Sequence, residues 1–152
     1  MNAAPLIFCE RTGNWAAAWR LAWQRAGIHF CEAPADLRCI ETRSPVECLE
    51  RLTDWPAAFV ILELTSAACD QTLDLLADIG VRFRPARLAV VCERPMIDYE
   101  WLARELGAVH VLASPRELPA LCRMVARYAA RLPEPSLDWE ERIWASLPWA
   151  GQ

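Results

Sequence analysis

The sequence predicts an α/β fold in which helices cover both faces of a parallel β-sheet. Five short apolar runs alternate with five segments of helical periodicity along the 152 residues. The run at 58–64 (AFVILEL) is almost continuously apolar, as expected for a parallel strand that is covered on both faces. Right-handed crossovers place the intervening helices on the two faces of such a sheet. The predicted fold class is therefore a three-layer α/β sandwich.

Each element follows from local apolar patterning. The predicted strands, in chain order, are residues 5–9, 37–41, 58–64, 87–92 and 108–113. The first four predicted helices are residues 14–26, 45–53, 67–79 and 98–106, and a fifth extends to about residue 132. The fifth has a clear apolar stripe, with apolar residues at 118, 121, 122, 125, 129 and 132.

Capping signals fix several helix ends. Ser44 and Ser114 are each followed by proline and, at the third position, by glutamate, which is the pattern of a capping box. Asp98 is expected to cap the fourth helix. Three helices are expected to stop at glycines, namely Gly27, Gly80 and Gly107.

Residues 1–132 form one predicted domain, and residues 133–152 form a tail that begins with Pro133 and Pro135. Trp139, Ile143 and Leu147 are spaced by four residues, which predicts a short amphipathic helix in the tail. Its apolar side chains are expected to pack on the same domain or on a second copy of the chain. The candidate interaction residues are Tyr99, Trp101, Trp139, Ile143, Trp144 and Trp149.

Composition excludes several classes of function. The net charge is −4 without a basic stripe, which argues against nucleic-acid binding. The absence of lysine excludes Schiff-base and Walker A chemistry. The seven cysteines form no CxxC pair and the two histidines are isolated, so no metal site is expected and the thiols should be reduced and mostly buried. No apolar run is long enough to span a membrane and no signal peptide is visible, so we expect a cytoplasmic protein.

The first helix carries Trp15, Trp19 and Trp23 at a spacing of four residues, with alanines beside them. An aromatic binding surface is one interpretation. Interdigitation of large and small side chains in the core is the favoured one.

The whole series of strands and helices resembles the receiver domain of bacterial two-component response regulators, over about residues 4–131. LARELGAVHVLASP (102–115) is similar to the receiver segment that ends in a Lys-Pro pair. AFVILEL (58–64) is similar to the receiver strand that ends in the phosphoacceptor aspartate. The resemblance implies the strand order 2-1-3-4-5 and a functional crevice at the carboxyl ends of the strands.

The receiver chemistry implied by the resemblance uses an Mg²⁺-binding acid pair, an aspartate, a hydroxyl residue and a lysine. This chain has Glu10, Arg11, Glu63, Cys92 and Ser114 at those places, and we call these five residues the degenerate receiver site. Arg11 puts a permanent positive charge where a metal-binding acid belongs. Phosphoryl transfer depends on positioning and charge neutralisation, so a site with these departures is not expected to turn over.

The sequence therefore predicts a non-catalytic protein–protein interaction module, a pseudo-receiver, with a protein partner and no cofactor. A homodimer is one candidate assembly. Arg11 and Glu63 are expected to form an ion pair in the crevice, although a Glu63 that mimics the charged, activated state is a second interpretation. A catalytic Cys92 would need a basic partner, for which Arg94 is the nearby candidate.

A flavodoxin-like FMN-binding protein is the alternative function. Arg11-Thr12-Gly13-Asn14 resembles part of the flavodoxin phosphate loop between the first strand and the first helix. Glu10 and Trp15 replace the hydroxyl residues of that loop, and Glu10 would repel a phosphate.

Overall fold

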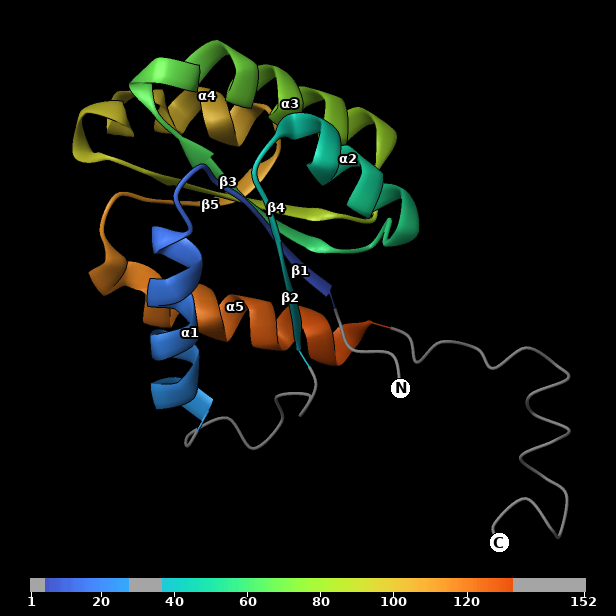
Figure 1. Cartoon of the computed structure of the whole chain (residues 1–152), viewed down its shortest axis with the longest axis vertical. Coiled ribbons are helices and arrows are strands. Elements are labelled where there is room, and N and C mark those ends of the chain that lie inside the picture. Colours follow the sequence, from blue (N-terminus) through green and yellow to red (C-terminus); the bar gives the residue numbers. More distant parts are fainter. Residues whose placement is uncertain (1–4, 28–36, 133–152) are drawn as a thin grey trace, which may run out of the picture.

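The computed structural model describes residues 5–27 and 37–132, and these form a five-stranded parallel sheet of order β2-β1-β3-β4-β5 (Figure 1). The strands are β1 (Pro5–Cys9), β2 (Arg38–Thr42), β3 (Phe59–Leu64), β4 (Arg87–Cys92) and β5 (Ala108–Leu112). The predicted fold class and strand order are both confirmed. The second strand begins and ends one residue later than predicted.

Helices cover both faces of the sheet. The α-helices are α1 (Asn14–Gly27), α2 (Pro45–Asp54), α3 (Cys69–Arg82), α4 (Glu100–Glu105) and α5 (Leu118–Arg131). Short 3₁₀ helices precede three of them: η1 (Ser66–Ala68), η2 (Arg94–Tyr99) and η3 (Pro115–Glu117). Helices α1 and α5 lie together on one face, and α2, α3 and α4 lie on the other (Figure 1).

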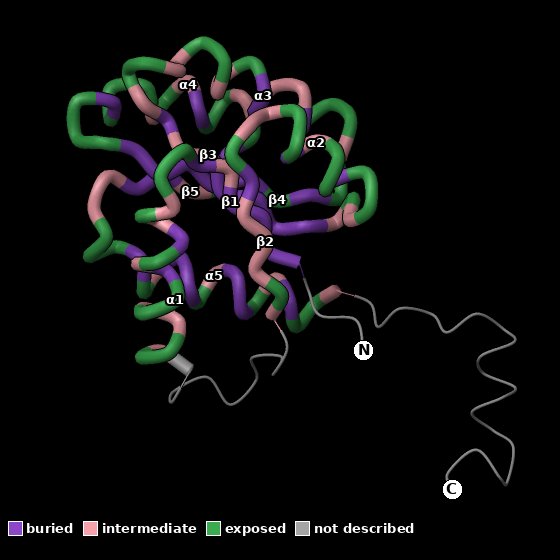
Figure 2. The backbone as a smooth tube through the Cα atoms, viewed as in Figure 1, coloured by how far each residue is buried: buried purple, intermediate pink, exposed green. Residues whose placement is uncertain are grey.

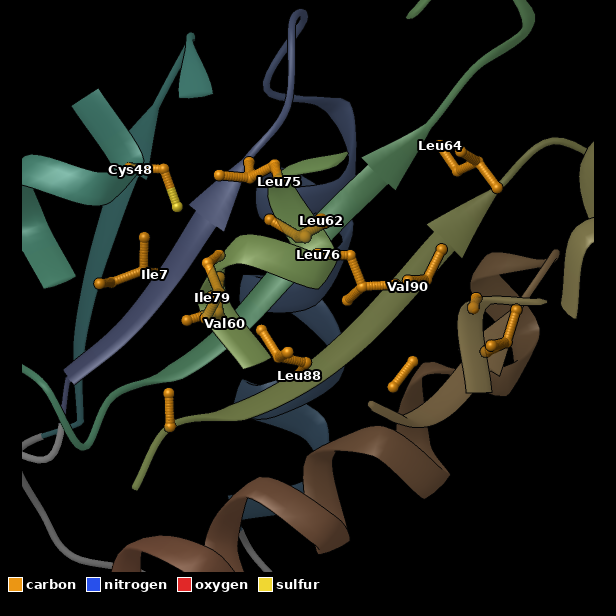
Figure 3. Packing of buried hydrophobic residues seen from close by; sticks show 14 of the residues in the cluster. Ile7, Cys48, Val60, Leu62, Leu64, Leu75, Leu76, Ile79, Leu88 and Val90 are labelled. Atoms are coloured by element: carbon orange, nitrogen blue, oxygen red, sulfur yellow. The ribbon is translucent and has the colours of Figure 1, made fainter. Parts of the chain in front are cut away.

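The alternation of side chains along the strands divides the core into two layers. In β3, Val60 and Leu62 face α2 and α3, whereas Phe59 and Ile61 face α1 and α5. Figure 3 shows the first layer, in which Leu76 and Ile79 of α3 pack over β3 and β4. The buried residues follow the sheet and the inner helix faces, and the outer helix faces are exposed (Figure 2). This two-sided burial explains why the strands are apolar at nearly every position.

Trp19 occupies the centre of the second layer and is only 1% exposed. Its ring centroid lies 5.4 Å from that of Trp23, and the two rings stack at 23°. The centroid of Phe8 lies 6.0 Å from it on the sheet side. The interpretation of the tryptophan row as core packing is therefore confirmed for Trp19, while Trp15 and Trp23 are partly buried.

Two predicted helix boundaries are wrong. Helix α3 continues through Gly80 to Arg82, because Gly80 serves close packing: a Cβ atom there would lie 3.2 Å from the Leu106 carbonyl oxygen. Asp98 does not cap a helix, since it lies inside η2, which begins earlier with Pro95 in its first turn. The Ser44 cap, the Ser114 capping box and the stop at Gly107, where φ is +112°, are confirmed.

The described cysteines are free thiols, and Cys48, Cys92 and Cys122 are buried. The predicted tail helix lies outside the described residues, as do Trp139, Ile143, Trp144 and Trp149. Among the helices of residues 5–27 and 37–132, we find none with the length and apolar character to cross a membrane.

Candidate functional site

The carboxyl ends of the strands bring the degenerate receiver site to one edge of the sheet. Glu10 and Arg11 follow β1, and Glu63 is the second-last residue of the neighbouring strand β3. Cys92 ends β4 and Ser114 follows β5. A small cavity of about 40 Å³ at this edge is lined by Glu10, Arg11 and Glu63, and by residues of the α2 and α3 sides. It has room for only a few water molecules.

Glu10 is 3% exposed, and its carboxylate caps helix α1. One carboxylate oxygen accepts a hydrogen bond from the backbone N–H of Trp15 at 2.9 Å, and the other accepts from Ala16 at 2.7 Å. Both N–H groups belong to the first turn of α1, where backbone donors have no partner within the helix. A negative charge is also stabilised at this end of a helix. Both carboxylate oxygens of Glu10 therefore serve to cap α1.

Arg11 and Glu63 are adjacent, but they do not form the predicted ion pair. The backbone N–H of Arg11 donates to Oε2 of Glu63 at 3.0 Å. Among the ion pairs between described residues, none involves the exposed guanidinium group of Arg11. The loop turns the Arg11 side chain into solvent, where its charge needs no partner. Thr72 of α3 also stabilises the end of β3, because its hydroxyl donates a hydrogen bond to the Glu63 carbonyl oxygen at 3.2 Å.

Arg43 is a site residue that the sequence analysis missed. It follows β2, and its guanidinium group donates to the Glu10 carbonyl oxygen at 3.3 Å and to the Glu41 carboxylate at 2.6 Å. Arg20 of α1 pairs with the same carboxylate, and the two arginines hold the pKa of Glu41 below its ordinary value. Arg43 therefore brings a fixed positive charge to the edge of the crevice.

The surroundings of Cys92 and Ser114 indicate structural roles for both residues. Burial, with smaller contributions from Glu100 and Glu117, raises the pKa of Cys92 to about 11. A thiol with a raised pKa is a weak nucleophile near neutral pH, so a catalytic Cys92 gains no support. The Ser114 hydroxyl accepts from the Arg116 N–H, and Glu117 accepts from the Ser114 N–H. Ser114 is thus used as a helix cap.

The described residues of the crevice do not favour binding of a metal ion or of the FMN phosphate. Within residues 5–27 and 37–132, no cluster of three or more His, Cys, Asp or Glu residues is placed to bind a metal ion. The phosphate of FMN would need the free N–H groups at the start of α1. The Glu10 carboxylate already occupies the N–H groups of Trp15 and Ala16. The flavodoxin alternative therefore gains no support from the geometry.

Exposed apolar side chains gather on another part of the domain. Trp101 of α4 is 72% exposed, and Tyr99 and Ile97 on the neighbouring η2 are also exposed. Trp101 and Tyr99 are the two predicted interaction residues that the structure describes, and both face solvent. A large, exposed tryptophan is typical of a protein-binding surface.

Gly13 closes the loop between β1 and α1, and its φ of +81° favours glycine. A Cβ atom there would lie 2.9 Å from a terminal nitrogen of Arg43. We expect Gly13→Ala to lower the free energy of unfolding by about 1–3 kcal/mol, through backbone strain and displacement of Arg43. Urea denaturation would measure this loss. In an Arg43→Ala background the loss should shrink by about 0.5 kcal/mol or more, and an equal loss in both backgrounds would contradict the contact.

Comparison with solved structures identifies the fold. No protein-family model and no curated protein matches the sequence. A response regulator from Thermotoga maritima superposes with a TM-score of 0.62 at 14% identity, covering 85% of this chain and 99% of that one. The chain has the receiver-domain fold.

Two further receiver-fold structures are similar over comparable lengths. A LuxR-family DNA-binding response regulator from Staphylococcus aureus gives a TM-score of 0.58 at 14% identity, covering 83% of this chain and 98% of that one. HP1043, an orphan response regulator of H. pylori, gives 0.57 at 17% identity, covering 84% and 99%. The predicted resemblance to receiver domains is thereby confirmed at the level of the fold.

Proposed function

We propose that this protein is a receiver-like interaction module that works without phosphorylation and binds a protein partner. The observation that carries the proposal is the engagement of Glu10. Both of its carboxylate oxygens bind backbone N–H groups of α1, so the acid that would hold Mg²⁺ in a receiver serves as a helix cap. The neighbouring position is arginine, and Arg43 adds a second cation at the same edge.

The other positions support the same proposal. The Glu63 carboxylate accepts a hydrogen bond from the Arg11 backbone, and Ser114 in the lysine position caps a helix. The chain contains no lysine that could neutralise a phosphoryl group. Phosphoryl transfer relies on a bound metal and on a cation in the lysine position, and the five residues supply neither a metal-binding acid pair nor that cation.

Incubation with acetyl phosphate and Mg²⁺ tests the loss of phosphoryl chemistry. We expect the intact mass of the protein to stay unchanged, whereas a receiver that keeps its acid pair gains one phosphoryl group under the same conditions. An adduct that forms on the wild-type chain and disappears in Glu63→Gln would contradict the proposal.

Protein binding is tested at Trp101. Tagged protein is used to capture partners from the native host, and the affinity of the captured partner is then measured for two variants. Trp101→Ala should weaken binding by about tenfold or more, because exposed tryptophans commonly dominate interfaces. Val81→Ala is the matched control, since Val81 is equally exposed but lies on α3. Equal binding by both variants would show that Trp101 is not part of the interface.

A further inference from the structure

A groove runs between α1 and α5 on the face of the sheet opposite α2, α3 and α4. Its volume is about 780 Å³. The apolar part of its lining comes from small and aliphatic side chains: Ala18, Leu21, Ala22, Ala26, Leu118 and Pro119. Leu21 is 58% exposed and forms the largest apolar side chain on the α1 side of the groove. Arg25, Arg116 and Arg123 border the groove.

The walls of the groove are strongly basic within an acidic protein. Helix α1 contains two arginines and α5 contains three, and neither helix contains an acidic residue. The whole chain carries a net charge of −4. The groove therefore offers an apolar floor between positively charged borders, which fits an amphipathic segment that is apolar on one side and acidic on the other.

The sequence after α5 has that composition. Residues 133–152 contain Leu137, Trp139, Ile143, Trp144, Leu147 and Trp149 as large apolar residues. Four acidic residues, at positions 134, 138, 140 and 141, outnumber the single Arg142. The spacing of Trp139, Ile143 and Leu147 would place them on one side of a helix. Asp138 and Glu141 would then lie on the opposite side, with Glu140 and Arg142 at the two edges of the apolar side.

The chain is long enough to bring this segment to the groove. Helix α5 ends at Arg131, and Arg123 at the border of the groove is eight residues earlier, which is about 12 Å along the helix axis. The four residues 133–136 span about 13 Å when extended. Leu137 can therefore reach the level of Arg123, which leaves the apolar residues after it available to the groove.

We propose that residues 137–149 form a helix that binds in the α1/α5 groove of the same chain. Trp139, Ile143 and Leu147 contact the alanine side of α1 and Leu21, and the acidic residues face the bordering arginines. The bound segment would cover the apolar groove that the described residues leave between α1 and α5. Protein partners of α4 would then meet a domain whose opposite side is already covered.

Trypsin tests the proposal on the full-length protein, because Arg142 is the single basic residue of the segment. Mass spectrometry follows the loss of residues 143–152 in the wild type and in Leu21→Glu. We expect the wild type to resist cleavage after Arg142 and Leu21→Glu to be cleaved about tenfold faster or more, because cleavage follows the population of the released segment.

Two variants and one dilution complete the test. Val46→Glu makes the same chemical change at an exposed position of α2, and its cleavage rate should match that of the wild type. Val109→Glu alters a second groove, on the other side of α5, and should also leave the rate unchanged. Rapid cleavage of the wild type, release by Val109→Glu in place of Leu21→Glu, or protection that disappears on dilution would each overturn the proposal. Protection lost on dilution would place the segment on a second copy.

Discussion

Replacing Trp19 with alanine is expected to lower the free energy of unfolding by about 3–5 kcal/mol, the usual range for removing a buried aromatic side chain. Trp19 is 1% exposed and lies between the sheet and α5, in contact with Phe8 and Trp23. The alanine variant leaves a large cavity beside residues that are fixed by the sheet and cannot collapse to fill it. Since small domains are stable by only about 5–15 kcal/mol, a substantial part of the stability would be lost.

Chemical denaturation followed by far-UV circular dichroism measures this loss without depending on tryptophan fluorescence. Trp101→Ala is the control, because it removes the same atoms from a side chain that is 72% exposed. Its free energy of unfolding should stay within about 0.5 kcal/mol of the wild type. Similar values for the two variants would mean that the Trp19 site repacks without a cavity.

The sheet could be predicted from the sequence because its physical signal is local. Strands covered on both faces must be apolar at nearly every position, and helices between them show the 3.6-residue period. Two serine caps could be predicted from the sequence, since the Ser44 and Ser114 hydroxyls each accept a hydrogen bond from a backbone N–H within three residues. Gly80 shows the limit of such reasoning. The same residue type ends helices and permits close packing, and only the nearby Leu106 carbonyl decides between them.

The site was harder to predict because its contacts join distant parts of the chain. Arg43 reaches the Glu10 carbonyl oxygen across 33 positions of sequence, so no local pattern indicates it. Arg11 was expected to act through its charge, yet its backbone N–H makes the contact with Glu63. Which atoms of a residue are used depends on the direction of the loop, and the loop turns at Gly13 with a positive φ.

Glu10→Ala is expected to lower the free energy of unfolding by about 2–4 kcal/mol. It removes two hydrogen bonds to a charged acceptor and leaves the N–H groups of Trp15 and Ala16 without a partner. The Ala16 residue is fully buried, so water does not easily replace the lost acceptor. The favourable charge at the start of α1 is lost as well. Thermal or urea denaturation measures the change, and Glu93→Ala, an exposed glutamate after β4, is the control that should leave stability unchanged.

The same variant separates a helix cap from a metal ligand. Carboxylates that share a cation repel one another when the cation is absent, so replacing one of them preserves or raises stability without metal. A capping carboxylate stabilises the fold whether or not metal is present. We therefore expect the loss in Glu10→Ala to be the same with and without Mg²⁺, and Mg²⁺ to leave the stability of the wild type unchanged. If Mg²⁺ stabilised the wild type but not Glu10→Ala, Glu10 would be identified as a metal ligand. That result would contradict the proposed loss of receiver chemistry in the crevice.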